Sequence, residues 1–107
     1  MTGKTRNIYV IELDKAVLKN KKFRMANPDY VEGKPCVYVG MTARSPEERF
    51  QQHKQGFKSA RLVKKYGMRL KPRLYRIHNP MTYEEACKME AEKARRLRKR
   101  GYGVWQN

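Results

Sequence analysis

The chain of 107 residues carries 26 lysines and arginines against 10 aspartates and glutamates, which gives a formal net charge of +16. This length predicts a single domain over residues 1–107, and a hydrophobic fraction of 39% predicts a modest core rather than a disordered chain. The excess of positive charge indicates a polyanionic partner. Nucleic acid is the favoured partner, with an anionic membrane face or another acidic partner as the alternatives. The sequence has no long apolar span, signal-peptide pattern or lipidation motif, which argues against a membrane protein.

Two apolar runs rich in β-branched and aromatic side chains predict strands at residues 7–13 and 35–41. Both runs are apolar on their two faces, as a central strand is. Between them, a polar and basic stretch at about residues 14–34 contains turn signals. We expect an inserted basic loop there, with a short helix over residues 14–23 as the alternative.

Ser45 and Glu48 flank a proline and indicate the start of a helix. Serine caps helices, proline suits the first helical position, and Glu48 would complete a capping box. We expect this helix to run to about Gln55 and to end at Gly56. A second short helix is expected over residues 59–66.

Residues 68–78 alternate between apolar and basic side chains and predict a half-exposed strand, which Pro72 places at a sheet edge or at a bulge. Thr82 is expected to cap a long helix that runs to about Arg100. Acids in the first turn and bases in the last turn suit the helix dipole. Gly101 is expected to end this helix.

On this late helix, Glu90 falls in the apolar stripe. At roughly 100° per residue, the residues within about 40° of it on the helical wheel are apolar or aromatic, namely Tyr83, Ala86, Ala94 and Leu97. Glu92, in contrast, falls roughly 160° away and is expected to face solvent. A carboxylate in an apolar stripe is unfavourable unless a cation or hydrogen-bond donors meet it. Glu90 is therefore a candidate functional acid, with a salt bridge to a core-lining arginine as the alternative.

Four more residues are candidates because of their order along the chain. Tyr9 and Tyr38 each lie in a predicted strand, and Arg49 and His53 are one helical turn apart just after Tyr38. An arginine offers planar, permanently charged donors that match phosphate oxygens. The alternative for each residue is structural: core aromatics for the tyrosines, a surface charge for Arg49 and a satisfied histidine for His53.

Cys36 and Cys87 have no metal-ligand spacing and lie in apolar contexts, so we expect free buried thiols in a reducing compartment. With two histidines and no paired cysteines, a structural zinc site is not expected. We accordingly expect a cytoplasmic or nucleoid-associated protein that is not secreted.

The order of the candidate residues resembles the pattern of the GIY-YIG nuclease superfamily, over roughly residues 7–107. Asn7-Ile8-Tyr9 corresponds to the Gly-Ile-Tyr strand of the family, with asparagine in place of the first glycine, and Tyr38-Val39-Gly40 corresponds to the Tyr-Ile-Gly strand. The gap between the two triplets is longer than in the family pattern, which marks residues 14–34 as an insertion.

Further along, Arg49 matches the family's helical arginine, and His53 matches the histidine that often follows one turn later. Glu90 matches the glutamate of a later helix, and Asn107 matches a final asparagine. The resemblance implies that Gly40 and Asn107 support the site.

The resemblance implies an α/β (α+β) fold with a small three-stranded antiparallel sheet flanked by helices, and the strands predicted above agree with it. It also implies a stand-alone, metal-dependent endonuclease that hydrolyses phosphodiester bonds in DNA. In that reading Tyr9 activates the water, and Tyr38 and His53 orient the phosphate or the water, with these roles open to exchange. Arg49 steadies the phosphoryl group, and Glu90 holds one divalent cation, Mg²⁺ or Mn²⁺.

The basic side chains predict two nucleic-acid-binding clusters: Lys58, Arg61, Lys64, Lys65, Arg69 and Arg73 in one, and Arg95, Arg96 and Lys99 in the other. No residue is assigned to base readout, so we expect weak sequence specificity. Trp105 and Tyr102 are candidates for base stacking, although packing of the tail on the domain is the favoured interpretation. A targeting partner protein and the oligomeric state stay open. The alternative function is a non-catalytic basic module with the same fold that binds DNA or RNA.

Overall fold

The computed structural model describes residues 3–106. Four strands form one mixed sheet in the order β3-β1-β2-β4, in which β1 is antiparallel to β2 and β3, and β4 is parallel to β2. The protein therefore has a mixed α+β fold, as predicted. The elements in chain order are β1 (Asn7–Leu13), η1 (Lys15–Lys19), α1 (Lys21–Ala26), β2 (Cys36–Thr42), α2 (Pro46–Gln55), α3 (Arg61–Tyr66), β3 (Gly67–Leu70), η2 (Pro72–Leu74), η3 (Arg76–His78), α4 (Tyr83–Lys99) and β4 (Gly103–Gln106).

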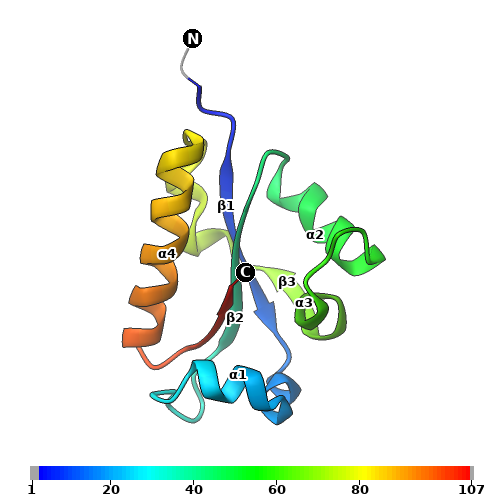
Figure 1. The fold of residues 1–107 in the computed structure, drawn as a ribbon, viewed down its shortest axis with the longest axis vertical. Coiled ribbons are helices and arrows are strands. Elements are labelled where there is room, and N and C mark those ends of the chain that lie inside the picture. Colours follow the sequence, from blue (N-terminus) through cyan, green and yellow to red (C-terminus); the bar gives the residue numbers. More distant parts are fainter. Residues whose placement is uncertain (1–2, 107) are drawn as a thin grey trace.

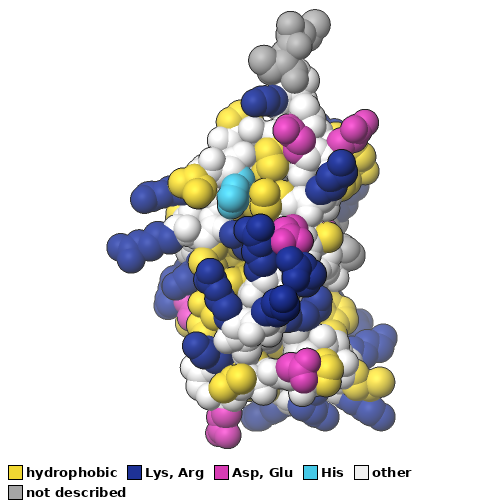
Figure 2. All heavy atoms as spheres, turned by 90° about the vertical axis from the view of Figure 1, so that its left-hand side faces the viewer, with side chains coloured by type: hydrophobic (Ala, Val, Ile, Leu, Met, Phe, Trp, Pro, Cys, Tyr) yellow, Lys and Arg dark blue, Asp and Glu magenta, His cyan; other side chains and the backbone are white. Residues whose placement is uncertain are grey.

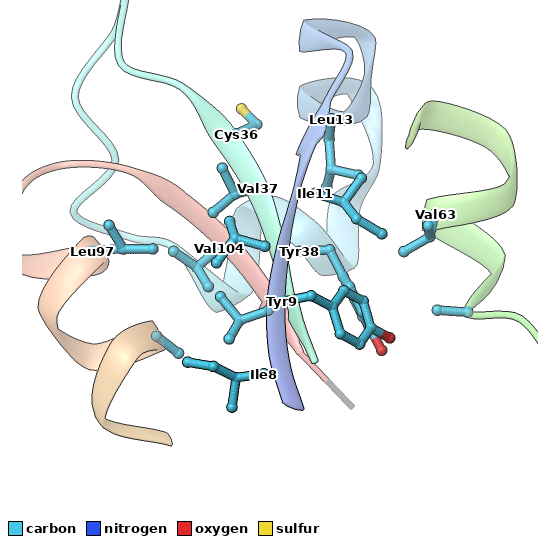
Figure 3. Packing of buried hydrophobic residues seen from close by; sticks show 14 of the residues in the cluster. Ile8, Tyr9, Ile11, Leu13, Cys36, Val37, Tyr38, Val63, Leu97 and Val104 are labelled. Atoms are coloured by element: carbon cyan, nitrogen blue, oxygen red, sulfur yellow. The ribbon is translucent and has the colours of Figure 1, made fainter. Parts of the chain in front are cut away.

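Helices cover both faces of the sheet (Figure 1). α4 lies against one face, and α2 and α3 lie against the other. Along β1 the side chains alternate between these faces: Ile8 points to α4, beside Leu97 and Val104, and Tyr9 points to the side of α3 (Figure 3). This alternation places successive residues of one apolar strand in two half-cores. The face toward α2 and α3 holds the candidate tyrosines.

The predicted three-stranded antiparallel sheet is wrong in two respects. The tail, for which no element is predicted, forms the fourth strand, and β4 pairs in parallel with Cys36–Val39 of β2. The predicted strand over residues 68–78 is much shorter, because β3 ends at Leu70 and two 3-10 turns follow. Lys71 still donates its backbone N–H to Val10, but Pro72 has no N–H and begins the first of these turns.

The predicted basic loop at about 14–34 contains η1 and α1, so the alternative of a helix in this stretch is the one observed. Phe23 anchors α1 because its buried ring packs against Trp105 of β4, with ring centroids 6.4 Å apart. The side chain of Asn27 accepts from the backbone N–H of Val104 at 2.8 Å and donates to its C=O at 3.0 Å. Asn27 thus takes the place of a further strand at the outer edge of β4.

The three predicted helices are confirmed apart from their terminal residues. Ser45 accepts from the Glu48 backbone N–H at 3.1 Å, and Gly56 ends α2 with a φ of 87°. The Glu48 carboxylate bonds the Ser45 hydroxyl rather than its backbone N–H, so the predicted reciprocal capping box is not formed there. A complete capping box joins Thr82 and Glu85 at the start of α4 instead. No helix within residues 3–106 has the length and apolar character needed to cross a membrane.

Candidate active site

Gly40 lies beneath the two candidate tyrosine rings. In the antiparallel register, Tyr9 is opposite Gly40 and Ile11 is opposite Tyr38, so all four positions share one face of the sheet. A Cβ atom on Gly40 would lie 2.7 Å from the Tyr9 hydroxyl and 2.8 Å from Cε2 of Tyr38. The glycine therefore leaves room for the two rings, whose centroids are 6.0 Å apart.

His53 reaches the same face from α2 and is fully buried. Its Nε2 lies 2.8 Å from the Tyr9 hydroxyl oxygen, and its Nδ1 accepts the backbone N–H of Ala60 at 3.2 Å. Because Nδ1 is an acceptor, we assign the single proton of the neutral imidazole to Nε2. His53 is then the donor to Tyr9, and the Tyr9 hydroxyl keeps its own proton for a different partner.

The surroundings keep both groups of this pair uncharged. Burial raises the pKa of Tyr9 well above its usual range, the Tyr38 hydroxyl adds to this rise, and the Arg49 charge opposes it. Burial and then the Arg49 charge lower the pKa of His53 from 6.5 to about 4. At neutral pH the pair is a neutral phenol and a neutral imidazole. Arg49 is the cation that favours the phenolate form of Tyr9.

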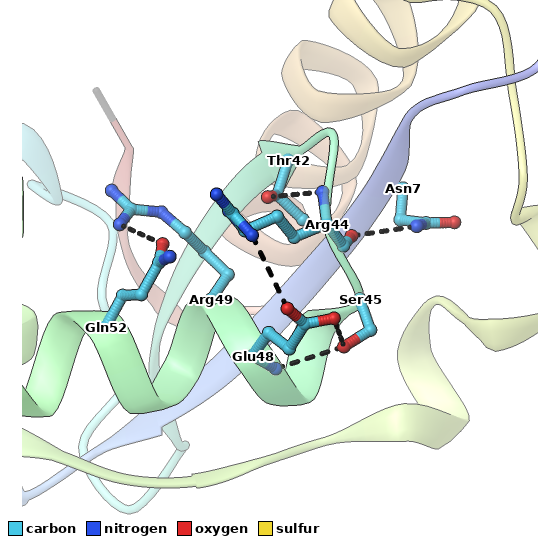
Figure 4. A network of polar contacts seen from close by, with 7 residues as sticks. All are labelled: Asn7, Thr42, Arg44, Ser45, Glu48, Arg49 and Gln52. Atoms are coloured by element: carbon cyan, nitrogen blue, oxygen red, sulfur yellow. Dashed lines mark hydrogen bonds and ion pairs between the residues drawn. The ribbon is translucent and has the colours of Figure 1, made fainter.

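Arg49 lies half-buried at the rim of the cluster. Its guanidinium donates to the backbone C=O groups of Phe57 at 3.1 Å and Lys58 at 2.6 Å. It also donates to Oε1 of Gln52 at 3.2 Å, one turn further along α2 (Figure 4). These acceptors fix the orientation of the guanidinium, so its charge stays beside Tyr9.

Glu90 lies on the α4 side of the sheet. Its Oε1 accepts from Nε2 of Gln106 at 3.5 Å, a long hydrogen bond, and Gln106 is opposite Val39 in the parallel pairing. Val39 alternates with Tyr38, so Gln106 belongs to the α4 face and Tyr38 to the other. Glu90 therefore lies on the opposite face of the sheet from the other predicted catalytic residues. Those four residues lie together on the α2 face: Tyr9, Tyr38, Arg49 and His53.

The carboxylate of Glu90 is half-buried and is not neutralised by a lysine or arginine within the described range, residues 3–106. The alternative interpretation, a salt bridge to a core-lining arginine, is therefore wrong. Burial raises the pKa of Glu90, and the hydrogen bond from Gln106 opposes this rise. An unneutralised, half-buried carboxylate fits a site in which it is one ligand of Mg²⁺ or Mn²⁺, and water and substrate oxygens complete the coordination shell. No group of three His, Cys, Asp or Glu side chains suited to a metal ion occurs among the described residues.

The nine predicted nucleic-acid-binding side chains are all exposed. Seen from the α4 side, lysines and arginines gather in a band across the molecule (Figure 2). Three of the nine have acid partners, because Arg69 pairs with Glu12, and Arg95 and Arg96 both pair with Glu92. The other six form no ion pair within residues 3–106: Lys58, Arg61, Lys64, Lys65, Arg73 and Lys99.

Sequence reasoning missed the groups that hold the candidate residues in place. The backbone of Ala60 orients His53, and Gln106 contacts Glu90, which is 16 positions away in the chain. Neither contact has a local sequence signal. The contact of Gln52 with Arg49 has one, because residues three apart on a helix are neighbours.

Cys36 is a buried free thiol and Cys87 is a half-buried one, which confirms that the cysteines are unpaired. The predicted final asparagine, Asn107, lies outside the described residues. Comparison of the chain with family models, curated proteins and solved structures found no match. The resemblance to GIY-YIG nucleases therefore depends on the sequence pattern alone and stays a prediction.

Proposed function

We propose that this protein is a divalent-metal-dependent endonuclease of the GIY-YIG type that hydrolyses phosphodiester bonds in DNA with weak sequence specificity. The observation that carries the proposal is the cluster over Gly40, where side chains from β1, β2 and α2 meet: Tyr9, Tyr38, His53 and Arg49. The first two strands of the sheet supply the phenols, and the following helix supplies the imidazole and the cation. A cluster of these residue types is the kind that phosphodiester hydrolysis needs.

In this reaction a water molecule attacks phosphorus, the bond to the leaving ester oxygen breaks, and that oxygen takes up a proton. Arg49 carries a fixed positive charge with planar donors, which suits it to binding the non-bridging oxygens as negative charge develops on them. The carbonyls of Phe57 and Lys58 hold the guanidinium in one orientation, so it needs no reorganisation during the reaction.

Tyr9 is our candidate for the group that takes the proton from the attacking water. Its deprotonated form would accept from Nε2–H of His53 and lie beside Arg49, which offsets part of the penalty from burial. His53 acts as a positioning residue in this scheme, because its Nε2 proton is directed at Tyr9 and its Nδ1 is occupied by Ala60. Tyr38 remains the alternative base, since its ring lies on the same face.

Glu90 would hold the divalent cation, Mg²⁺ or Mn²⁺, which when bound supplies positive charge to the phosphoryl and leaving oxygens. Its half-buried carboxylate has no cationic side chain within residues 3–106 to compete for it. DNA bound over the end of β4 would have to reach both Glu90 and the tyrosine cluster.

The test is cleavage of plain and branched duplex DNA by the purified protein with Mg²⁺ or Mn²⁺. We expect nicking by wild type that stops when the metal is chelated, and no nicking by Glu90→Ala or Arg49→Ala. Equal inertness of wild type and Glu90→Ala on all these substrates would remove the endonuclease proposal.

The second candidate is a non-catalytic module with the same fold that binds DNA or RNA. Its support is the burial of the cluster, since Tyr9, Tyr38 and His53 are only 1%, 2% and 0% exposed. This module would bind duplex DNA with a salt slope of roughly 0.9 per phosphate neutralised, and would not cleave it. Metal-dependent turnover that follows the Glu90 and Arg49 variants excludes this candidate.

A further inference from the structure

We propose that a basic pocket next to the tyrosine cluster binds an unpaired nucleobase of the DNA, with Trp105 as its stacking surface. The proposal rests on the proposed function and specifies its substrate as DNA that carries a single-stranded or unpaired nucleotide. The pocket has a volume of about 410 Å³ and is formed by parts of α1, α3 and β4. This volume is within the usual range of small-molecule sites, roughly 300–1,000 Å³.

The pocket adjoins the candidate active site through two of its lining residues. Ala60 lines the pocket and donates its backbone N–H to His53, the partner of Tyr9. Trp105 lines the pocket from β4 and is opposite Tyr38 in the parallel pairing. A nucleotide bound in the pocket would therefore lie beside the cluster.

Trp105 has the features of a stacking platform. Its indole packs against Phe23 with an interplanar angle of 33°, which holds the ring in place, and the residue is still partly exposed. Within residues 3–106 the indole N–H has no hydrogen-bond partner and is not buried, so it is a donor available to a ligand. A rigid aromatic ring that is supported on one side and accessible from a pocket suits a nucleobase.

The charge around Trp105 matches a nucleotide strand. Lys21 and Lys22 come from α1 and Arg61 comes from α3, and all three are exposed. In the part of the chain that the structure describes, none of these cations has an ion-pair partner, and no acid lines the pocket. Three cations around one aromatic ring combine phosphate neutralisation with stacking, the combination that single-strand binding sites use.

Only an unpaired nucleotide can use both features at once. In a duplex the bases are stacked on one another, so an indole reaches a base face only where the base is unpaired or displaced from the stack. The inserted segment at about 14–34 acquires a role in this reading, because its helix α1 supplies two of the three cations.

A binding experiment tests the pocket without any cleavage, because the chain contains a single tryptophan, Trp105. Its fluorescence is titrated, in buffer with EDTA, with single-stranded oligothymidylate and with a blunt, fully paired two-strand duplex of equal nucleotide number. We expect the single strand to quench the emission strongly and the duplex to quench it weakly. Equal quenching by both, or quenching by neither, overturns the proposal.

Variants connect the pocket to the substrate. In a polarisation assay with dye-labelled single strand, Trp105→Leu is expected to bind about tenfold more weakly, and Trp105→Phe, which keeps a ring on Phe23, by less. Lys22→Ala should also weaken binding, whereas Lys88→Ala, an exposed lysine outside the pocket, serves as the matched control. Unchanged affinity in both Trp105→Leu and Lys22→Ala contradicts the pocket.

Cleavage assays then separate this proposal from the proposed function. If wild type cuts DNA with a single-stranded tail faster than blunt duplex, and Trp105→Leu loses that preference, both stand. If wild type cuts the two substrates equally, and the single strand fails to quench Trp105, the pocket proposal fails and the nuclease survives. If the single strand quenches Trp105 but no substrate is cut, the pocket stands and the nuclease proposal fails.

Discussion

The backbone N–H of Ala60 donates to Nδ1 of His53, and this one contact decides how His53 meets Tyr9. With Nδ1 accepting, the imidazole donates through Nε2 to the Tyr9 hydroxyl at 2.8 Å. A protonated imidazole would carry hydrogens on both nitrogens and would place one against the Ala60 N–H. The neutral form is therefore built into the native fold.

This neutral form predicts a loss of stability in acid. The pKa of His53 is lowered from 6.5 to about 4 in the native protein. Between pH 6.5 and pH 4 the imidazole is therefore protonated in the unfolded chain and neutral in the native protein. The contribution of neutral His53 to the free energy of unfolding is fully present above about pH 6.5 and declines as the pH falls toward 4. Its full size is about 3 kcal/mol. Urea unfolding of wild type and His53→Gln at several pH values measures it. The wild-type free energy of unfolding should fall more between pH 7 and pH 4 than that of the variant, and parallel curves would contradict the assignment.

Gly40→Ala should destabilise the protein and disturb the cluster. The new Cβ atom would meet the Tyr9 and Tyr38 rings at 2.7 and 2.8 Å, and neither ring has free space in the core. We expect a loss of about 1–3 kcal/mol in the free energy of unfolding, together with reduced cleavage. Chemical denaturation measures the first effect, and an unchanged midpoint would show that the rings move aside freely.

Arg49→Lys should reduce cleavage by roughly 100-fold while the protein still folds. A lysine cannot reproduce the planar fork that donates to the Phe57 and Lys58 carbonyls and that, in the proposed reaction, would bind the phosphate. The matched control is Arg44→Lys, since the Arg44 side chain, two residues before α2, forms an exposed ion pair with Glu48 (Figure 4). Initial rates of nicking of supercoiled plasmid measure both variants, and equal losses in the two would remove the special role of Arg49.

Glu90→Gln should separate stability from catalysis. Because burial raises the pKa of Glu90, the native fold favours the protonated carboxyl and loses stability as the pH rises through that pKa. The neutral amide should therefore raise the unfolding midpoint at pH 7 and abolish metal-dependent cleavage. Glu84→Gln, on the exposed first turn of the same helix, should leave cleavage unchanged and should not raise the midpoint, because Glu84 favours the helix dipole. Retained cleavage in Glu90→Gln would exclude Glu90 as the metal ligand.

Asn27→Ala should loosen β4 and with it the Trp105 pocket. The Asn27 amide pairs with both backbone groups of Val104 and accepts from Arg98, so its removal leaves a buried N–H without a partner. We expect a loss of about 2–3 kcal/mol in the free energy of unfolding. Hydrogen exchange of the Val104 amide provides a local readout, and unchanged protection there would contradict the edge-strand role.

The elements whose signals are local could be predicted from the sequence alone. The strands β1 and β2 follow from apolar runs, and the starts of α2 and α4 follow from capping side chains at Ser45 and Thr82. The same reasoning placed Glu90 in the stripe toward the sheet and Glu92 toward solvent, where Arg95 and Arg96 pair with it. Periodicity and caps act within a few residues, which is why they can be read without a structure.

The contacts between distant parts of the chain could not be predicted from the sequence and follow from the packing of the elements. Asn27 and Val104 are 77 positions apart, and their pairing makes a strand of a tail that carries no strand signal of its own. The His53 proton is placed by the backbone of Ala60, and Trp105 meets cations from two helices that are far apart in sequence. Such contacts depend on how the elements pack, and a backbone N–H group has the same chemistry at every non-proline position. The sequence therefore supplied the candidate side chains, and packing decided which of them meet.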